Sequence, residues 1–103
     1  MKEYTHPEMR DVTLPMIMQA LADPCRMAIV CTLLQAKDRA LACNEVPLDV
    51  AKATRSHHFE MLRSAGIIFT KVEGTKCMTS LRQQELEQCF PGLLRLVEAH
   101  NGL

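Results

Sequence analysis

The most constraining feature of this chain is a helical segment that ends at a glycine and is followed at once by two strand-like runs. Residues 52–65 have the apolar spacing of a helix, and Gly66 stands where a left-handed residue usually ends one. Residues 67–72 are rich in β-branched side chains, and a glycine-containing turn at 73–75 separates them from a second run at 76–81. This arrangement predicts a β-hairpin. The fold must therefore combine helices with one hairpin.

Two helix starts precede this region, and a proline marks each of them. Thr13 can cap a helix that Pro15 helps to open and that runs through residue 22. Asp23 caps a second helix, predicted over residues 24–35, in which apolar side chains recur at helical spacing. Both helices are therefore expected to bury one face.

The rest of the chain adds three shorter elements. Residues 36–39 read as a loop, and residues 41–46 as a short third helix that Pro47 ends. Residues 82–89 look helical, and a last apolar stripe follows an interruption at 90–92, formed by Leu93, Leu94, Leu96 and Val97. The order helix, helix, short helix, helix, hairpin, helix predicts a mainly α fold with a small hairpin, the winged helix-turn-helix.

The size of the chain favours one domain that pairs with a second copy. It has 103 residues, of which 48% are apolar, so it holds one modest core that would gain from burial at a dimer interface. We divide the domain 1–103 into an N-terminal arm (1–12), a winged-helix core (13–81) and a C-terminal dimerisation region (82–103). The apolar stripe after residue 92 is expected to bury against the partner together with Leu14, Ile17 and Met18.

Composition indicates a cytoplasmic protein. No apolar run approaches the roughly 20 residues of a membrane-spanning helix, and residues 1–10 do not resemble a secretory signal. The five cysteines are an odd number without paired spacing, which disfavours a disulfide framework. We therefore expect reduced thiols and no membrane partner.

Positive charge gathers in the middle of the chain although the formal net charge is zero. Residues 50–80 carry five basic against two acidic side chains. On a helical wheel, one side of residues 52–65 is expected to pack inward, with members Thr54, His58, Met61, Leu62 and Ala65. The opposite side carries Lys52, Ala53, Ser56, His57, Glu60 and Arg63. Beside a hairpin that carries Lys71 and Lys76, this face suits DNA, whereas alone it could be a merely solvated charged face.

Three segments resemble the ArsR/SmtB family of regulators. They are Ala-Leu-Ala-Asp-Pro-Cys-Arg at 20–26, the run from Thr54 to Ile68 that contains Ser-His-His and Leu-Arg-Ser-Ala-Gly, and Glu-Gly-Thr at 73–75. The resemblance covers about residues 14–98. It implies a homodimeric repressor that binds double-stranded operator DNA, pairs through its first and last helices, and is released by an inducer.

The resemblance also assigns roles on the recognition helix. It implies that Ser56 and His57 reach DNA and that His58 is a packed structural histidine. The chain departs from the usual pattern at Ala53, where relatives often have serine, and at Arg55, where they often have a small apolar residue. The predicted DNA-binding residues are Lys52, Ala53, Thr54, Arg55, Ser56, His57, Arg63, Lys71, Thr75 and Lys76.

The cysteines raise the question of what the protein senses. Zinc-type sensing needs three or four converging ligands, whereas residues 41–46 offer only Cys43 and the last helix offers only Glu98 and His100. No metal or other cofactor is therefore predicted, and a metal-responsive repressor is the less favoured alternative. Cys31 resembles the thiol of sulfide- and redox-responsive members of the family, and Cys89 is its nearest equivalent partner. The alternative for Cys31 is a small apolar core residue.

Other functional classes fit less well. A Cys-His hydrolase or transferase would need a thiol, an imidazole and an orienting group in one pocket, and no spacing supports that. A winged helix that only binds proteins stays open. We therefore expect a DNA-binding regulator and no enzyme.

Overall fold

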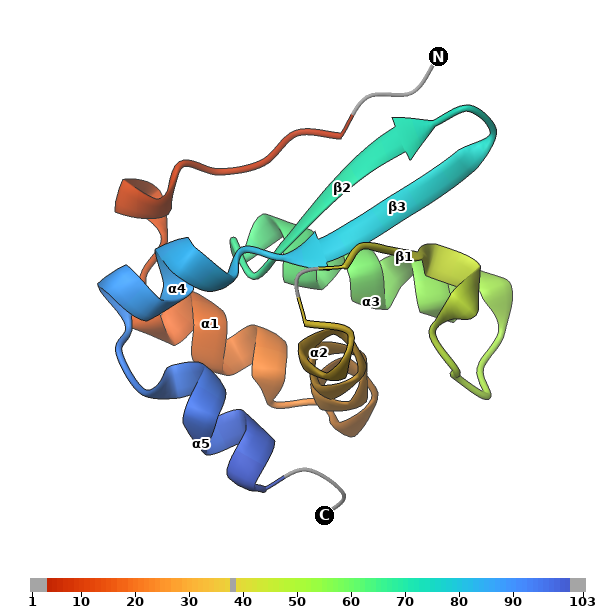
Figure 1. The fold of residues 1–103 in the computed structure, drawn as a ribbon. Coiled ribbons are helices and arrows are strands. Elements are labelled where there is room, and N and C mark those ends of the chain that lie inside the picture. Colours follow the sequence, from red (N-terminus) through yellow and green to blue (C-terminus); the bar gives the residue numbers. More distant parts are fainter. Residues whose placement is uncertain (1–3, 38, 101–103) are drawn as a thin grey trace.

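The computed structural model describes residues 4–37 and 39–100. The first three residues of the predicted arm, position 38 of the predicted loop and the last three residues of the predicted dimerisation region lie outside that range. The elements in chain order (Figure 1) are the 3-10 turn η1 (Met9–Asp11), α1 (Leu14–Leu21), α2 (Pro24–Gln35), β1 (Leu41–Ala42), the 3-10 turn η2 (Cys43–Glu45), α3 (Lys52–Ser64), β2 (Ile68–Glu73), β3 (Lys76–Leu81), α4 (Gln83–Cys89) and α5 (Leu93–Ala99).

The first two helices begin where the capping residues predicted. The Thr13 hydroxyl accepts a hydrogen bond from the Met16 backbone N–H at 3.3 Å. The Asp23 carboxylate accepts from the backbone N–H groups of Cys25 and Arg26 at 2.7 and 3.2 Å. Each cap satisfies donors that have no partner inside the helix, so the predicted starts of α1 and α2 are confirmed.

The helix predicted over residues 41–46 is wrong. Leu41 and Ala42 form a strand that pairs with Thr79 and Met78 of β3, and residues 43–45 then make a 3-10 turn. The Glu45 carboxylate accepts from the Ala42 backbone N–H at 2.8 Å and stabilises this turn. The cause is tertiary, because β3 offers an unpaired edge that attracts a nearby extended segment.

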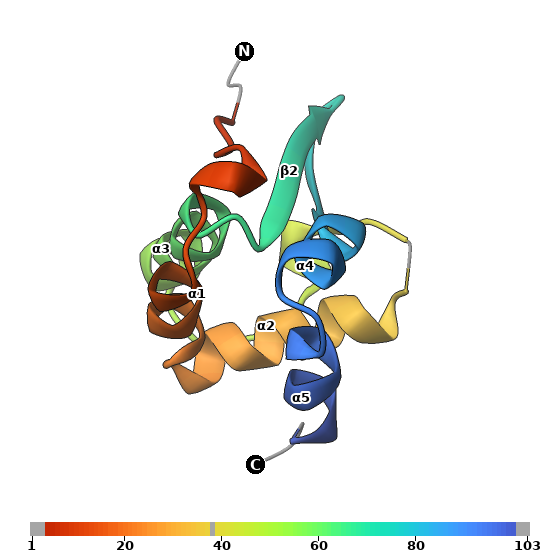
Figure 2. The ribbon, with the colours of Figure 1, turned by 90° about the vertical axis from the view of Figure 1, so that its left-hand side faces the viewer.

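The predicted hairpin is confirmed and provides two strands of a three-stranded antiparallel sheet of order β1-β3-β2, in which β3 is central. Its register pairs Glu73 with Lys76, and Gly74 at the turn has the positive φ of 65° that such a turn requires. The hairpin β2–β3, which we call the wing, projects beyond the helices in both views (Figures 1 and 2).

Helix α2 occupies the centre of the fold and packs against α1, α3, α5 and β3. The largest fully buried apolar side chains come from α2 itself and from α1, α3, β2 and α4, and they include Ile17, Ile29, Leu33, Leu62, Ile68 and Leu86. Burial of this apolar surface is the main source of stability in a domain of this size.

The terminal helices use most of their apolar side chains within the protomer itself. Ile17 and three members of the predicted stripe (Leu93, Leu94 and Val97) are buried in the core. Leu14, Met18 and Leu96 are 45%, 48% and 56% exposed. The sequence therefore overestimated the apolar surface that these helices leave for a partner, because it could not separate core from interface.

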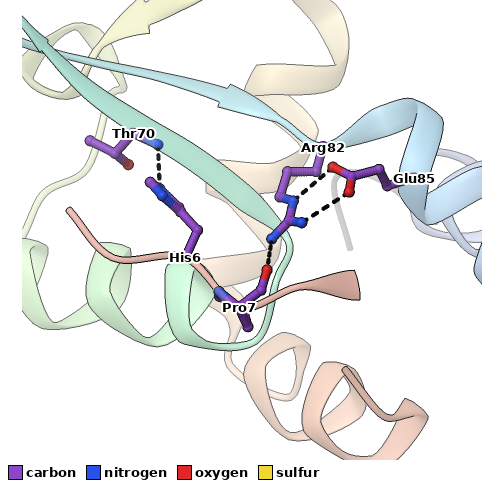
Figure 3. A network of polar contacts seen from close by, with 5 residues as sticks. All are labelled: His6, Pro7, Thr70, Arg82 and Glu85. Atoms are coloured by element: carbon purple, nitrogen blue, oxygen red, sulfur yellow. Dashed lines mark hydrogen bonds and ion pairs between the residues drawn. The ribbon is translucent and has the colours of Figure 1, made fainter. Parts of the chain in front are cut away.

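Part of the N-terminal arm packs against the rest of the domain. Met9 and Val12 are buried, the His6 imidazole accepts a hydrogen bond from the Thr70 backbone N–H of β2, and the Pro7 carbonyl accepts one from Arg82 (Figure 3). Gly66 has a φ of 79°, and a Cβ built there would lie 2.5 Å from Val12 Cγ2. A glycine at the end of α3 thus permits both the left-handed turn and the close approach of the arm.

Within the described ranges, no single helix is long and apolar enough to cross a membrane. Helices α1 and α2 taken together have the required length and apolar composition, but they are bent by 102° relative to each other.

Candidate nucleic-acid interface

Helix α3 presents one side to the core and the other to solvent. His58, Phe59 and Leu62 are buried, and they all lie beyond the first turn of the helix. Five of the six side chains predicted to face outward are exposed, namely Lys52, Ala53, Ser56, His57 and Glu60, whereas the sixth, Arg63, is partly buried. Thr54 was predicted to pack inward and is exposed, because the first turn of α3 contributes no buried residue.

Arg55 has a structural role that the sequence argument missed. Its Nη1 donates to the backbone carbonyls of Cys43 and Val46 at 3.1 and 2.7 Å, and its Nη2 donates to that of Leu48 at 3.0 Å. The guanidinium thus fastens the segment between β1 and α3 to the recognition helix. Arg55 therefore has an anchoring role within the protein, and its predicted contact with DNA stays a prediction.

Arg63 also faces a protein group. Its guanidinium carbon lies 4.3 Å from the ring centroid of Tyr4, within the range of a cation–π interaction. Arg63 is partly buried. The end of α3 is therefore connected to the N-terminal arm, while the exposed cation at its beginning is Lys52.

The wing adds a second positively charged surface. Lys71, Thr75 and Lys76 are all exposed around its tip. Lys71 Nζ lies 3.5 Å from Glu73 Oε2, and both side chains are more than half exposed. An exposed pair of this kind contributes little to stability, so Lys71 stays available to a phosphate.

His58 joins three helices. It is 7% exposed, and its Nδ1 lies 3.3 Å from Arg26 Nη1. The same arginine also donates to the carbonyls of Ala20 and Gln19. His58 therefore packs as a structural residue, as the resemblance implied. Its partner Arg26, on α2, connects α1 with α3.

One group of possible metal ligands surrounds this junction. Asp23, Cys25 and His58 offer ligand atoms that lie within 4.8 Å of one another. Burial raises the pKa of Asp23, but the backbone N–H groups of Arg26 and Cys25, together with the charges of His58 and Arg26, lower it, so the pKa lies below its usual value. The Asp23 carboxylate already caps α2, and the Arg26 cation beside His58 disfavours a second cation there.

The cysteines are arranged differently from the predicted Cys31–Cys89 pair. All five are free thiols, and Cys31 is buried in α2 whereas Cys89 is exposed at the last residue of α4. Burial, and then the Glu98 carboxylate, raise the pKa of the Cys31 thiol. The two sulfur atoms in mutual contact belong to Cys43 and Cys77, with Sγ atoms 2.8 Å apart.

This thiol pair, Cys43 and Cys77, lines a cavity of about 490 Å³ beside the recognition helix. The walls of the cavity also include residues predicted to bind DNA, and the lining contains Tyr4, Lys52, Arg55, Ser56 and Arg63. Thirty-four positions separate the two cysteines, so no local spacing signals their contact. To predict this contact, one would have to know that residues 41–42 pair with β3 and which side of the sheet each side chain of β3 faces.

Comparison with known proteins was made with both the sequence and the fold. No protein-family model matches the chain. The chain is 36% identical over 80 residues to the HTH-type transcriptional regulator YceK of Bacillus subtilis, covering 76% of this chain and 79% of YceK. It is 29% identical over 86 residues to a biofilm growth-associated repressor of Agrobacterium fabrum, covering 84% and 73% of the two chains.

The fold is similarly shared. The crystal structure of an ArsR family transcriptional regulator superposes with a TM-score of 0.66 at 26% identity, over 84% of this chain and 93% of that one. Together with the resemblance to YceK, these observations show that the chain belongs to the ArsR family of winged helix-turn-helix transcriptional regulators and is not an enzyme.

Proposed function

We propose that this regulator is a homodimeric repressor that binds operator DNA with α3 in the major groove and the wing on the phosphate backbone. The observation that supports this most is the exposed first half of α3, where Ser56, His57 and Lys52 lie on the surface next to the wing. A hydroxyl and an imidazole can both hydrogen-bond to base edges, and lysines neutralise phosphates. The resemblance to a repressor of Agrobacterium fabrum supports repression of transcription rather than its activation.

The proposed dimer uses the two terminal helices. Leu14 and Met18 lie one turn apart on α1, and Leu96 is exposed on α5. Two copies could cover these side chains in one symmetric interface, since a two-fold axis presents the same patch to both partners. The dimer places two recognition helices on the two halves of an operator.

We also propose that an inducer releases the protein from its operator. It would weaken the complex with the operator, and the protein would work in the cytoplasm, where its thiols stay reduced. A switch through Cys31 and Cys89 stays a prediction, and because Cys31 is buried, an oxidant reaches it only when the packing around α2 opens. A metal-responsive repressor is the weaker alternative.

The decisive experiment is DNA binding to the region upstream of the protein's own coding sequence. We expect retardation of this DNA at a sequence with inverted symmetry, with an affinity well above that for unrelated DNA of equal length at each salt concentration. Equal affinity for both DNAs, or no binding to either, would contradict the proposal. The second result would favour a winged helix that binds proteins.

A further inference from the structure

The contact between Cys43 and Cys77 follows from the pairing of β1 with β3. Leu41 lies opposite Thr79 and Ala42 opposite Met78, and Cys43, which follows β1 as the first residue of η2, lies beside Cys77 of β3. Their Sγ atoms are 2.8 Å apart, and a disulfide requires about 2.05 Å. Because the two sulfur atoms are already in contact, a small movement is enough to close that gap.

Both thiols are reachable from solvent. Each is partly exposed, and each lines the cavity of about 490 Å³ beside α3. A small molecule can therefore approach the sulfur atoms without unfolding the protein. This position differs from that of Cys31, which is buried in α2.

We propose that the thiol pair is a reversible oxidation site that closes to a disulfide and thereby weakens operator binding, with a low-molecular-weight disulfide as oxidant. The regulatory part rests on the proposed DNA-binding function. The chemical part, formation of the disulfide, stands on the geometry of the two cysteines alone.

The reaction is two successive thiol–disulfide exchanges. The Cys77 thiolate attacks one sulfur of the oxidant RSSR, forms a mixed disulfide and expels RS⁻. Cys43 then loses its proton and its sulfur attacks Cys77 Sγ, which expels the second RS⁻. The two protein thiols have lost two electrons and two protons, and the oxidant has become two RSH molecules.

The order of attack follows from the surroundings of Cys43. Burial, and then its hydrogen bond with Cys77, raise the pKa of Cys43 to about 12, so it is a protonated thiol at neutral pH. Once Cys77 carries a mixed disulfide, that sulfur no longer acts as a charged neighbour, and one cause of the high pKa is removed. Cys43 is therefore the resolving thiol.

Two contacts connect the thiol pair to the recognition helix. The Cys77 thiol donates a hydrogen bond to the Tyr4 hydroxyl at 3.5 Å, and the Tyr4 ring makes a cation–π contact with the guanidinium of Arg63. The carbonyl of Cys43 accepts from Arg55, which lies next to Ser56 on α3. A disulfide removes the thiol proton donated to Tyr4 and repositions Cys43, so it changes the support of α3 at both ends.

The test uses the full chain, oxidised glutathione as the probe, and trypsin digestion after free thiols are alkylated. Cleavage after basic residues yields peptide 40–52 with Cys43 and peptide 77–82 with Cys77. We expect these two peptides to be linked. The Cys43→Ser variant should retain glutathione on peptide 77–82, because it has no resolving thiol, and Cys77→Ser should give neither product. Cys89→Ser, a change at an exposed thiol, should behave as the parent.

The regulatory part is read from DNA affinity. Oxidation should weaken binding to the upstream DNA about fivefold, the factor that corresponds to the loss of one hydrogen bond, and dithiothreitol should restore it. The double variant Cys43→Ser with Cys77→Ser should bind equally well with and without oxidant. Thermal unfolding of each variant in the reduced state establishes that the fold is retained.

Other results would overturn the proposal in distinguishable ways. Unlinked peptides, or a link between peptides 27–37 and 83–95, which carry Cys31 and Cys89, would refute the assigned pair. A disulfide between Cys43 and Cys77 that leaves DNA affinity unchanged would refute its regulatory role. Reduced protein that binds no DNA would instead refute the proposed function, while the peptide map would still decide the chemistry.

Discussion

The Nε2 atom of His6 accepts a hydrogen bond from the Thr70 backbone N–H at 2.9 Å and so fastens the N-terminal arm to β2 (Figure 3). The His6 ring also stacks on Phe69 with centroids 4.3 Å apart. Next to it, Arg82 donates to the Pro7 carbonyl at 2.7 Å and forms a two-pronged ion pair with Glu85. The arm, the wing and the start of α4 are thus connected through one network.

This network predicts that the arm detaches in acid. Burial, and then the cations Arg82 and Arg63, lower the pKa of His6. A lowered pKa means that the detached arm takes up the proton more readily, so docking is fully stable above about pH 6.5 and is lost as pH falls below it. The NMR signals of the Thr70 amide should therefore shift between about pH 7.5 and about pH 5.

The matched control for this titration is His6→Leu, which keeps an apolar group on Phe69 but has no titrating nitrogen. Its Thr70 amide should not respond to pH over the same range. An equal response of the parent and the variant would show that another group causes the shift.

Replacing Ser56 and His57 together with alanine should reduce operator affinity at least about tenfold, because each good base contact contributes roughly 1–3 kcal/mol. Both side chains are exposed, so the fold should be retained. Gln84→Ala, at an exposed position on α4, serves as control and should bind as the parent does. The assignment of α3 as the reading helix fails if the double variant keeps its affinity in a gel-retardation titration.

Changing Lys76 to alanine should weaken binding to all DNA sequences alike. The reason is that an exposed lysine at the tip of the wing is placed for a phosphate, which carries no base information. The slope of log affinity against log salt should fall by about one, and Lys71→Ala should do the same. A change in the preferred sequence would mean that the wing reads bases.

Changing Arg55 to alanine should lower the free energy of unfolding by about 1–3 kcal/mol, because three backbone carbonyls lose their donor. Urea denaturation measures this, and Lys52→Ala, an exposed change on the same helix, should stay within about 0.5 kcal/mol of the parent. If Arg55→Ala were as stable as the parent and merely lowered the salt slope, Arg55 would be a phosphate contact after all.

Changing Met18 to glutamate should convert the proposed dimer into a monomer of about the chain mass, 11.6 kDa. Met18 is 48% exposed on α1, and a charge there would be costly inside an apolar interface. Phe69→Gln alters an equally exposed apolar residue on the wing and should stay dimeric in sedimentation velocity. A parent protein that is monomeric at micromolar concentration would refute the interface.

Local sequence signals located α1–α5 and the wing, although they wrongly predicted a helix over residues 41–46. Thr13 and Asp23 cap α1 and α2, and Gly66 ends α3, because capping and left-handed turns depend on residues a few positions apart. The exposed side of α3 also followed from periodicity, since a helix has a fixed angle per residue. The resemblance of residues 54–68 was enough to name the family.

Contacts between distant residues were decided only by the tertiary structure. Residues 41–42 became a strand because β3 had an edge to pair with, and that pairing placed Cys43 against Cys77. Arg55 found its carbonyl partners only after the segment between β1 and α3 had folded back on it. Which apolar side chains of α5 enter the core likewise depends on how the helix is rotated against α2. Periodicity says that a face is apolar, but the packing of the whole chain decides what covers it.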